Sequence, residues 1–329
     1  MHASQTFRGA IAVAALSALA AAAASVSHAQ SKFPMKPIRL VAATLPGSQP
    51  DGLSRMIGQK LSESWGRPVI IDNRPGGGGL IGASMVAKAA PDGHTLLYAL
   101  PNFAISAVIQ PTLPYDPLKD FVGVTQIGFS TNVLIVTPSL GVKTVNDFVA
   151  LAKAQPGKLI FGSSATGTAG HLSGARFNLI TGIRTVQVAY KGGPDAMIEV
   201  LAGRAHYNVG TMGVVLPFVK EGKLTALAVT TPQRAAVLPD VPALAETLSE
   251  FKRPETSHAV LAPAGTPRAI VSQINKEIAR ILDLPDVRER IQTIGFVLAP
   301  STPGESDRIL RAQIETLTKV VVDAGLRPK

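Results

Sequence analysis

The chain contains no cysteine and no metal-binding arrangement of histidines. With no cysteine among its 329 residues, it can form no disulfide, carry no thiol nucleophile and bind no metal through thiolates. The histidines beyond residue 29 are His94, His171, His206 and His258. No two of them have the spacing of a metal-ligand pair. We therefore expect no metal site, and we interpret each histidine as structural rather than catalytic.

The sequence also lacks local catalytic motifs. Neither H-E-x-x-H nor G-x-S-x-G occurs in it, so the signatures of zinc peptidases and α/β-hydrolases are both missing. A serine hydrolase with a dispersed triad stays open, because such a triad leaves no local pattern. We predict a protein that binds without catalysing, and a secreted hydrolase or dehydrogenase is the alternative.

One glycine-rich stretch formally matches a dinucleotide-binding motif. G-x-G-x-x-G extends from Gly77 to Gly82, after one predicted strand and before a predicted helix. Four consecutive glycines satisfy this pattern easily, and no suitable ribose-binding acid follows a second strand. We interpret the stretch as a tight strand-to-helix turn and predict no cofactor.

Only the N-terminus holds an apolar run that approaches the length of a membrane span. His2 and Arg8 precede a charge-free run over residues 9–24, and small residues follow at 27–29. This order is typical of a signal peptide cut before Gln30. An uncleaved membrane anchor is the alternative, but the alanine-rich run is weakly hydrophobic. We therefore predict a signal peptide over residues 1–29 and a protein that is exported to the periplasm.

Positive charge exceeds negative charge without being clustered. Lys and Arg number 32 and Asp and Glu number 22, which makes the formal net charge +10. The basic residues stand singly along the chain rather than in a stripe, so we predict no nucleic-acid partner. A dispersed positive balance can still attract anions over a distance.

Strand-like and helix-like segments alternate along the chain. Short apolar runs at 38–42 and 69–71 flank an amphipathic stretch at 52–65, and a second series begins at 159–161. The alternation predicts an α/β fold with two mainly parallel sheets flanked by helices. Because no low-complexity linker separates the two series, we expect two lobes joined by two crossing strands near Ser130 and Ser257. Lobe 1 would comprise residues 30–130 and 257–329, and lobe 2 residues 131–256.

A turn-forming segment follows the first predicted strand. It contains Thr44, Gly47, Ser48 and Asp51 directly before a helix. Backbone N–H groups and the positive end of the helix attract anions at such turns. Gly47 allows close approach and Ser48 can donate a hydrogen bond, whereas Asp51 either caps the helix or accepts hydrogen bonds within the loop.

An equivalent segment opens the second series after residue 161. It offers hydroxyls and glycines before a predicted helix at 172–179, and its candidate ligand-binding residues are Ser163, Ser164, Thr166, Gly167, Thr168 and His171. Uncharged donors and backbone amides are what a carboxylate site requires. An ordinary loop is the alternative. The pairing of the two turns, one in each predicted lobe, favours a shared ligand.

Several ordered motifs resemble those of one family, the Bug-type periplasmic receptors of tripartite tricarboxylate transporters. The resemblance covers nearly the whole chain after the leader. It is carried by DNRPG at 72–76, APDGHTLL at 90–97, LPYDPLKDF at 113–121, PGKL at 156–159, YKG at 190–192, GKL at 222–224, LPDVP at 238–242 and LAPAGTP at 261–267.

The resemblance implies a clamshell that holds a small organic acid between the two turns. It adds Tyr190, Gly192, Gly210 and Thr211 to the candidate ligand-binding residues. The sequence departs from the family at Ser48, where a second glycine is usual, and at Pro50, which has no N–H. It departs again at 210–211, where an aspartate and an asparagine are frequent, and this weakly disfavours an amino-acid ligand.

These observations predict a monomeric solute-binding receptor that captures a small carboxylate and passes it to a cognate membrane permease. Service to a sensor kinase is the alternative within binding proteins. The sequence leaves the ligand open among aliphatic dicarboxylates, citrate-like acids, aromatic acids and nicotinate-like rings.

Overall fold

The computed structural model describes residues 33–163, 168–190, 193–252 and 257–325. The predicted signal peptide, residues 1–29, lies outside the described residues. Within the described ranges, no helix combines the length and the apolar character that a membrane crossing requires.

The first sheet has six strands in the order β11-β4-β10-β3-β1-β2. Their bounds are β1 Ile38–Ala42, β2 Val69–Asn73, β3 Thr95–Ala99, β4 Phe121–Ser130, β10 His258–Pro263 and β11 Phe296–Leu298. β1 pairs in parallel with β2 and β3, whereas β10 runs antiparallel to β3 and β4, and β11 antiparallel to β4.

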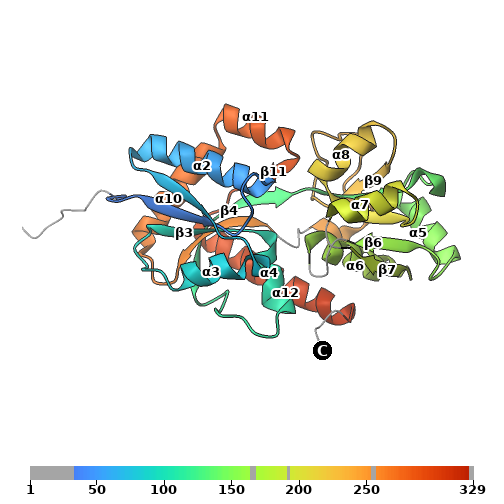
Figure 1. Cartoon of the computed structure of the whole chain (residues 1–329), viewed down its shortest axis with the longest axis horizontal. Coiled ribbons are helices and arrows are strands. Elements are labelled where there is room, and N and C mark those ends of the chain that lie inside the picture. Colours follow the sequence, from blue (N-terminus) through green and yellow to red (C-terminus); the bar gives the residue numbers. More distant parts are fainter. Residues whose placement is uncertain (1–32, 164–167, 191–192, 253–256, 326–329) are drawn as a thin grey trace, which may run out of the picture. The chain divides into compact units, whose positions relative to one another are not determined.

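Helices cover both faces of this sheet. They are α2 Gln49–Trp65, α3 Leu80–Ala87, α4 Pro101–Ile109, α10 Arg268–Leu282, α11 Pro285–Thr293 and α12 Pro303–Asp323, and a 3-10 turn, η1 Gly77–Gly79, precedes α3. α2 contacts α10 on one face, whereas α4 contacts α3 and α12 on the other (Figure 1). The C-terminal helices α10 and α12 both pack on β4, so the C-terminal part returns to the first sheet as its apolar spacing predicts.

The second sheet has five strands in the order β7-β6-β8-β5-β9. Its strands and helices are β5 Asn132–Val136, η2 Pro138–Leu140, α5 Val145–Ala154, β6 Ile160–Ser163, α6 Ala169–Thr181, β7 Val186–Ala189, α7 Gly193–Leu201, β8 Tyr207–Thr211, α8 Met212–Lys220, β9 Thr225–Val229, α9 Leu244–Thr247 and η3 Ser249–Lys252. On β5, Leu134 and Val136 join one core cluster while Val133 and Ile135 join another. From Val133 to Val136 the strand is apolar, because helices cover both of its faces.

The two-lobed α/β fold is confirmed, but the expectation of mainly parallel sheets is wrong. In the second sheet, β6 is parallel to β7 and β8, yet β5 is antiparallel to β8 and β9. A helical crossover makes neighbouring strands parallel. β5 and β10 instead follow strands of the other sheet: only Thr131 separates β5 from β4, and β10 is the first strand after β9. Each sheet is therefore mixed.

A buried histidine joins three strands of the first sheet where the chain leaves it. His258 is 2% exposed; its Nε2 lies 2.8 Å from the Ser130 hydroxyl and its Nδ1 lies 3.3 Å from the Tyr98 hydroxyl. The ring also meets the edge of Phe296, with centroids 5.0 Å apart. Burial lowers the pKa of His258 to about 3, so the imidazole is neutral and exchanges hydrogen bonds with both hydroxyls.

Close packing of a helical glycine seats α6 on β6. A Cβ atom on Gly174 would lie 2.0 Å from Cζ of Phe161, and Phe161 is completely buried. Any side chain at position 174 would force the helix away from the sheet, because a packed core has no space to absorb it. Gly174 thereby helps to hold the N-terminus of α6 at the end of β6.

We expect Gly174→Ala to lower the free energy of unfolding by about 1 to 3 kcal/mol, the usual cost of overpacking. Gly213→Ala is the matched control, because Gly213 also lies in a helix but a Cβ there would meet nothing within 4 Å. The free energy of unfolding of this control should rise by up to about 1 kcal/mol, because alanine has a higher helix propensity than glycine. Urea denaturation measures both changes, and equal stability of the two variants would contradict the packing role.

Candidate functional site

The first turn connects the end of β1 to the start of α2. Gly47 has φ +80, a left-handed conformation that other residues adopt only with strain. Ser48 is the N-cap of α2, so the helix begins before residue 52, where the sequence placed it. The Thr44 and Ser48 hydroxyl oxygens lie 2.8 Å apart, and the Ser48 hydroxyl donates to the Leu45 carbonyl at 2.7 Å. Pro50 fits the first helical turn, where its missing N–H is not needed.

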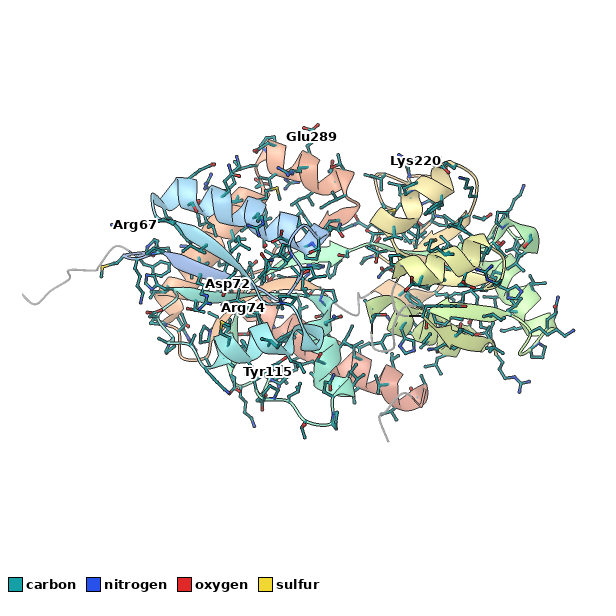
Figure 2. All side chains as sticks on the ribbon, viewed as in Figure 1. Arg67, Asp72, Arg74, Tyr115, Lys220 and Glu289 are labelled. Carbon is teal, nitrogen blue, oxygen red and sulfur yellow. The ribbon has the colours of Figure 1, made fainter. Side chains whose placement is uncertain are left out.

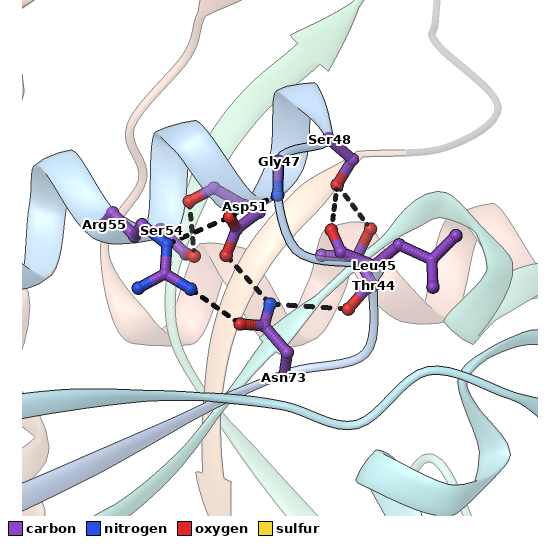
Figure 3. Close-up of polar contacts among 8 residues, drawn as sticks. All are labelled: Thr44, Leu45, Gly47, Ser48, Asp51, Ser54, Arg55 and Asn73. Atoms are coloured by element: carbon purple, nitrogen blue, oxygen red, sulfur yellow. Dashed lines mark hydrogen bonds and ion pairs between the residues drawn. The ribbon is translucent and has the colours of Figure 1, made fainter.

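Asp51 holds this turn together (Figure 3). The side chain is only 3% exposed. Its Oδ2 accepts from the Gly47 N–H at 2.8 Å and from Arg55 Nε at 2.9 Å, and its Oδ1 accepts from Asn73 Nδ2 at 2.8 Å. Because Ser48 is the N-cap, Asp51 does not act as a plain cap. It fixes the loop before the helix through a backbone amide.

The cluster keeps Asp51 ionised and neutralises its charge. Burial alone would raise the pKa of Asp51, but hydrogen bonds from Arg55, Gly47 and Asn73, with the Arg55 charge, hold it below its ordinary value. The Arg55 side chain is 51% exposed, so solvent screens much of the ion pair. A neutralised Asp51 does not repel an anion bound at the turn.

Arg55 and Asn73 are missing from the sequence-derived site. Arg55 Nη2 donates to Asn73 Oδ1 at 2.8 Å, and Asn73 Nδ2 also reaches the Thr44 carbonyl at 3.4 Å. Position 55 follows Asp51 by one helical turn, a spacing that favours an ion pair. Asn73 lies within the DNRPG motif, but its contact with Asp51 needs the pairing of β1 with β2. The neighbouring Asp72 binds Arg39 instead. It also pairs with Arg74, which Figure 2 labels together with Asp72.

Few backbone donors of the first turn remain available to a ligand. Pro46 and Pro50 have no N–H, and the Gly47 N–H is bound to Asp51. The amide groups of Leu45 and Gln49 have no acceptor among the described residues. Both lie at the positive end of α2, where an anion is stabilised.

The glycine-rich stretch packs against the base of this turn. Gly76 to Gly79 all have positive φ, and a Cβ on Gly79 would lie 3.4 Å from Cβ of Ala43. β2 ends at Asn73 and α3 begins at Leu80, so the segment is the tight strand-to-helix turn that the sequence predicts.

The second turn follows β6, the strand between β7 and β8. Ser163 is completely buried; its hydroxyl accepts from Gln187 Nε2 at 3.5 Å, and its carbonyl accepts from the Tyr190 N–H at 3.0 Å. Thr168 is the N-cap of α6 and accepts from the His171 N–H at 3.4 Å. The candidate residues Ser164, Thr166, Gly167 and Gly192 lie outside the described residues.

His171 lies in the first turn of α6 and is completely buried. Burial lowers the pKa of His171, although a hydrogen bond with Gln187 opposes the shift. The imidazole is therefore neutral at physiological pH, and it supports the turn as an uncharged group.

Asn208 on β8 is a polar residue that the sequence analysis did not select. It is 2% exposed, its Nδ2 donates to the Gly162 carbonyl, and its Oδ1 has no hydrogen-bond partner among the described residues. A Cβ on Gly210 would lie 2.8 Å from that oxygen and 2.6 Å from Val215. Gly210 is therefore required for packing, whereas Thr211 is exposed as the N-cap of α8.

The structure thus forms two separate groups from the candidate residues. Thr44, Gly47, Ser48 and Asp51 cluster after β1. Ser163 ends β6 beside Tyr190, which follows β7, and Gly210 and Thr211 end the neighbouring β8. In each group the residues lie at the carboxyl ends of parallel strands, where open α/β sheets bind ligands.

The chain matches a family model described as "Tripartite tricarboxylate transporter family receptor" over residues 53–326. Protein BugT of Bordetella pertussis is 32% identical over 90% of this chain and 92% of its own length. Rpa4515 from R. palustris, solved with adipate, is 32% identical with a TM-score of 0.74 and covers 89% of this chain and 98% of its own. MatC from Rhodopseudomonas palustris, solved with malate, is 27% identical with a TM-score of 0.69 over 88% of this chain and all of its own.

We expect Asp51→Ala to bind a carboxylate ligand far more weakly than Asp51→Asn, because asparagine keeps the shape and one acceptor for Gly47 or Asn73. Calorimetric titration with the ligand identified by screening measures the difference. Asp72→Asn is the matched control, since Asp72 neighbours the cluster but pairs with Arg39 and Arg74. Equal affinity of Asp51→Ala and the parent would place the ligand away from this turn.

Proposed function

The chain belongs to the tripartite tricarboxylate transporter receptor family, and we propose that it captures a small carboxylate and presents it to the membrane permease of such a transporter. The family and its structural neighbours are solute-binding receptors. We propose further that the ligand lies between the first and second turns, with lobe 1 at residues 30–130 and 257–329 and lobe 2 at 131–256.

The neutralised Asp51 cluster is the observation that carries this proposal. An isolated buried carboxylate would repel an anionic ligand at the first turn, but Arg55 offsets its charge. The carboxylate instead orders the loop that offers the Leu45 and Gln49 amide groups. Thr168 and the N-terminus of α6 supply comparable donors in the second turn.

A dicarboxylate suits two such groups better than a monocarboxylate. Each turn offers uncharged donors at the positive end of a helix, and one carboxylate can occupy each turn. The neighbours solved with adipate and malate both hold dicarboxylates. Binding that bridges both lobes would stabilise a closed state through a hinge motion. Micromolar affinity corresponds to about 8 kcal/mol, which a few charge-assisted hydrogen bonds can supply.

A sensor kinase is the second candidate partner, because a closed receptor can be recognised by a receptor domain as well as by a permease. A secreted enzyme is the alternative outside binding proteins. Turnover of a bound ligand during incubation distinguishes that alternative from the receptor.

We propose that residues 1–29 direct the protein to the periplasm and are removed there. The intact mass of protein recovered from the periplasm should correspond to a chain that begins at Gln30. Retention of Met1 in that material would contradict both the cleavage and the soluble receptor.

A thermal-shift screen tests the ligand class. Protein purified through unfolding and refolding should be stabilised by dicarboxylates such as adipate and malate. At 100 times its dissociation constant a ligand adds about 2.7 kcal/mol to the free energy of unfolding. If carboxylates as a class gave no stabilisation, the proposal would fail.

Two N-cap variants separate binding from folding in the same assay. Thr168→Ala should lose about 1 kcal/mol of stability, because it loses its helix cap. In the proposed site the Thr168 hydroxyl also binds a carboxylate, so the variant should lose roughly 1.5 to 3 kcal/mol of binding free energy as well, the value of one hydrogen bond to a charged group. Thr144→Ala removes the N-cap of α5, which accepts from the Asp147 N–H at 3.1 Å. This control should lose stability alone. Full affinity in Thr168→Ala would remove Thr168 from the site.

A further inference from the structure

Two hydroxyl groups of the first turn form a short hydrogen-bonded chain (Figure 3). The Ser48 hydroxyl oxygen lies 2.7 Å from the Leu45 carbonyl oxygen and 2.8 Å from the Thr44 hydroxyl oxygen. A carbonyl oxygen has no hydrogen to donate, so the hydrogen between Ser48 and Leu45 belongs to Ser48. Because a hydroxyl carries only one hydrogen, the hydrogen between Thr44 and Ser48 must belong to Thr44.

This direction of donation leaves neither hydroxyl hydrogen for a ligand. Ser48 donates to the Leu45 carbonyl, and Thr44 donates to Ser48. An ionised carboxylate only accepts hydrogen bonds, so it gains nothing from these two oxygens. A carboxylate bound at the first turn therefore depends on the backbone amides of Leu45 and Gln49, at the positive end of α2.

The hydroxyl oxygen of Thr44 remains an open acceptor. It accepts a hydrogen bond from no residue that the structure describes, so both of its lone pairs are available. Thr44 is only partly buried, and a group bound at the turn can approach it. Thr44 also directly precedes Leu45, whose amide belongs to the proposed carboxylate site. A hydrogen-bond donor next to the carboxylate of the ligand fits this acceptor.

We propose that the first turn selects a carboxylate with a hydroxyl group on the adjacent carbon, so that the ligand is a 2-hydroxy dicarboxylate. Its carboxylate accepts from the Leu45 and Gln49 amides, and its 2-hydroxyl donates to Thr44 Oγ1. An ammonium group in the same place would lie at the positive end of α2, which disfavours it. This inference rests on the proposed function, because it concerns the same site.

Two matched pairs of probes measure the contribution of the hydroxyl group. They are malate with succinate, and 2-hydroxyadipate with adipate; within each pair the chain length and both carboxylates are the same. In calorimetric titrations of the full mature chain, freed of bound ligand by unfolding and refolding, the better enantiomer of the hydroxy acid should bind roughly five-fold tighter. That ratio is expected for one neutral hydrogen bond.

Two further probes identify the donor. 2-Methoxysuccinate keeps the ether oxygen but has no hydroxyl hydrogen, so it should bind no more tightly than succinate. Aspartate carries an ammonium group in place of the hydroxyl, and it should bind more weakly than malate.

Two variants assign the preference to the hydroxyl chain. Thr44→Val removes the acceptor with little change of shape and should equalise the members of each pair. Ser48→Ala removes the acceptor of the Thr44 hydrogen, which can then bind a carboxylate, so this variant should bind succinate more tightly than the parent does. Ser48 makes no side-chain hydrogen bond as the N-cap of α2, so its replacement should cost little stability.

Thr316→Val is the matched control. Its hydroxyl also donates to a backbone carbonyl, that of Ala312 at 2.8 Å, but it lies in α12 and outside both turns. This variant should keep the five-fold preference of the parent. Cooperative unfolding in urea checks that all three variants fold.

The outcomes separate this inference from the proposed function. Equal affinity within a pair that binds would overturn the inference alone, because a water molecule would then satisfy Thr44. A five-fold preference that persists in Thr44→Val would overturn it too, as would tighter binding of 2-methoxysuccinate than of succinate or of aspartate than of malate. Absence of binding by both pairs also defeats it, whereas the proposed function fails only if no carboxylate of the screen stabilises the protein.

Discussion

The buried carboxylate of Asp51 is the contact on which the first turn depends. It joins the loop at Gly47, the helix at Arg55 and the neighbouring strand at Asn73, so three segments share one acceptor group. A buried carboxylate is costly unless it is paired and hydrogen-bonded. Because the partners come from different segments, they can satisfy Asp51 only when β1, α2 and β2 are correctly assembled. The same arrangement fixes the loop and cancels its charge.

The second turn is organised by packing and backbone contacts rather than by a charge. Gly174 lets α6 approach Phe161, the Thr168 hydroxyl caps that helix, and Asn208 holds the Gly162 carbonyl. None of these contacts has a net charge, and His171 is neutral as well. Of the groups that the structure describes at this turn, only dipoles would stabilise a carboxylate bound there.

The sequence predicted the α/β alternation, both turns and the C-terminal return to the first sheet, because these features follow from local periodicity and turn composition. It missed the antiparallel strands. β5 and β10 read as ordinary apolar strands, and their direction depends on where the chain crosses between sheets rather than on residue type. It identified Asp51 but not Arg55 and Asn73 as its partners, since Asn73 reaches the cluster only through the β1–β2 register. The sequence analysis selected Gly210 as a ligand contact. The structure shows in addition that Val215 and Asn208 leave no room for a side chain at position 210, which no local sequence pattern reveals.

β4 connects the features that lie outside the two turns. Along this one strand, the Gln126 N–H donates to the Ser301 hydroxyl just before α12, and Ser130 binds His258 just before the chain enters the second sheet. α12 packs on β4 and also contacts α6, the helix that follows the second turn. Leu172 of α6 shares a buried cluster with Leu317 and Val321 of α12. The hinge motion proposed above would have to preserve or exchange this apolar contact, because exposing three buried aliphatic side chains would cost several times about 1.5 kcal/mol. α12 thus contacts both β4 of the first sheet and the helix that follows the second turn.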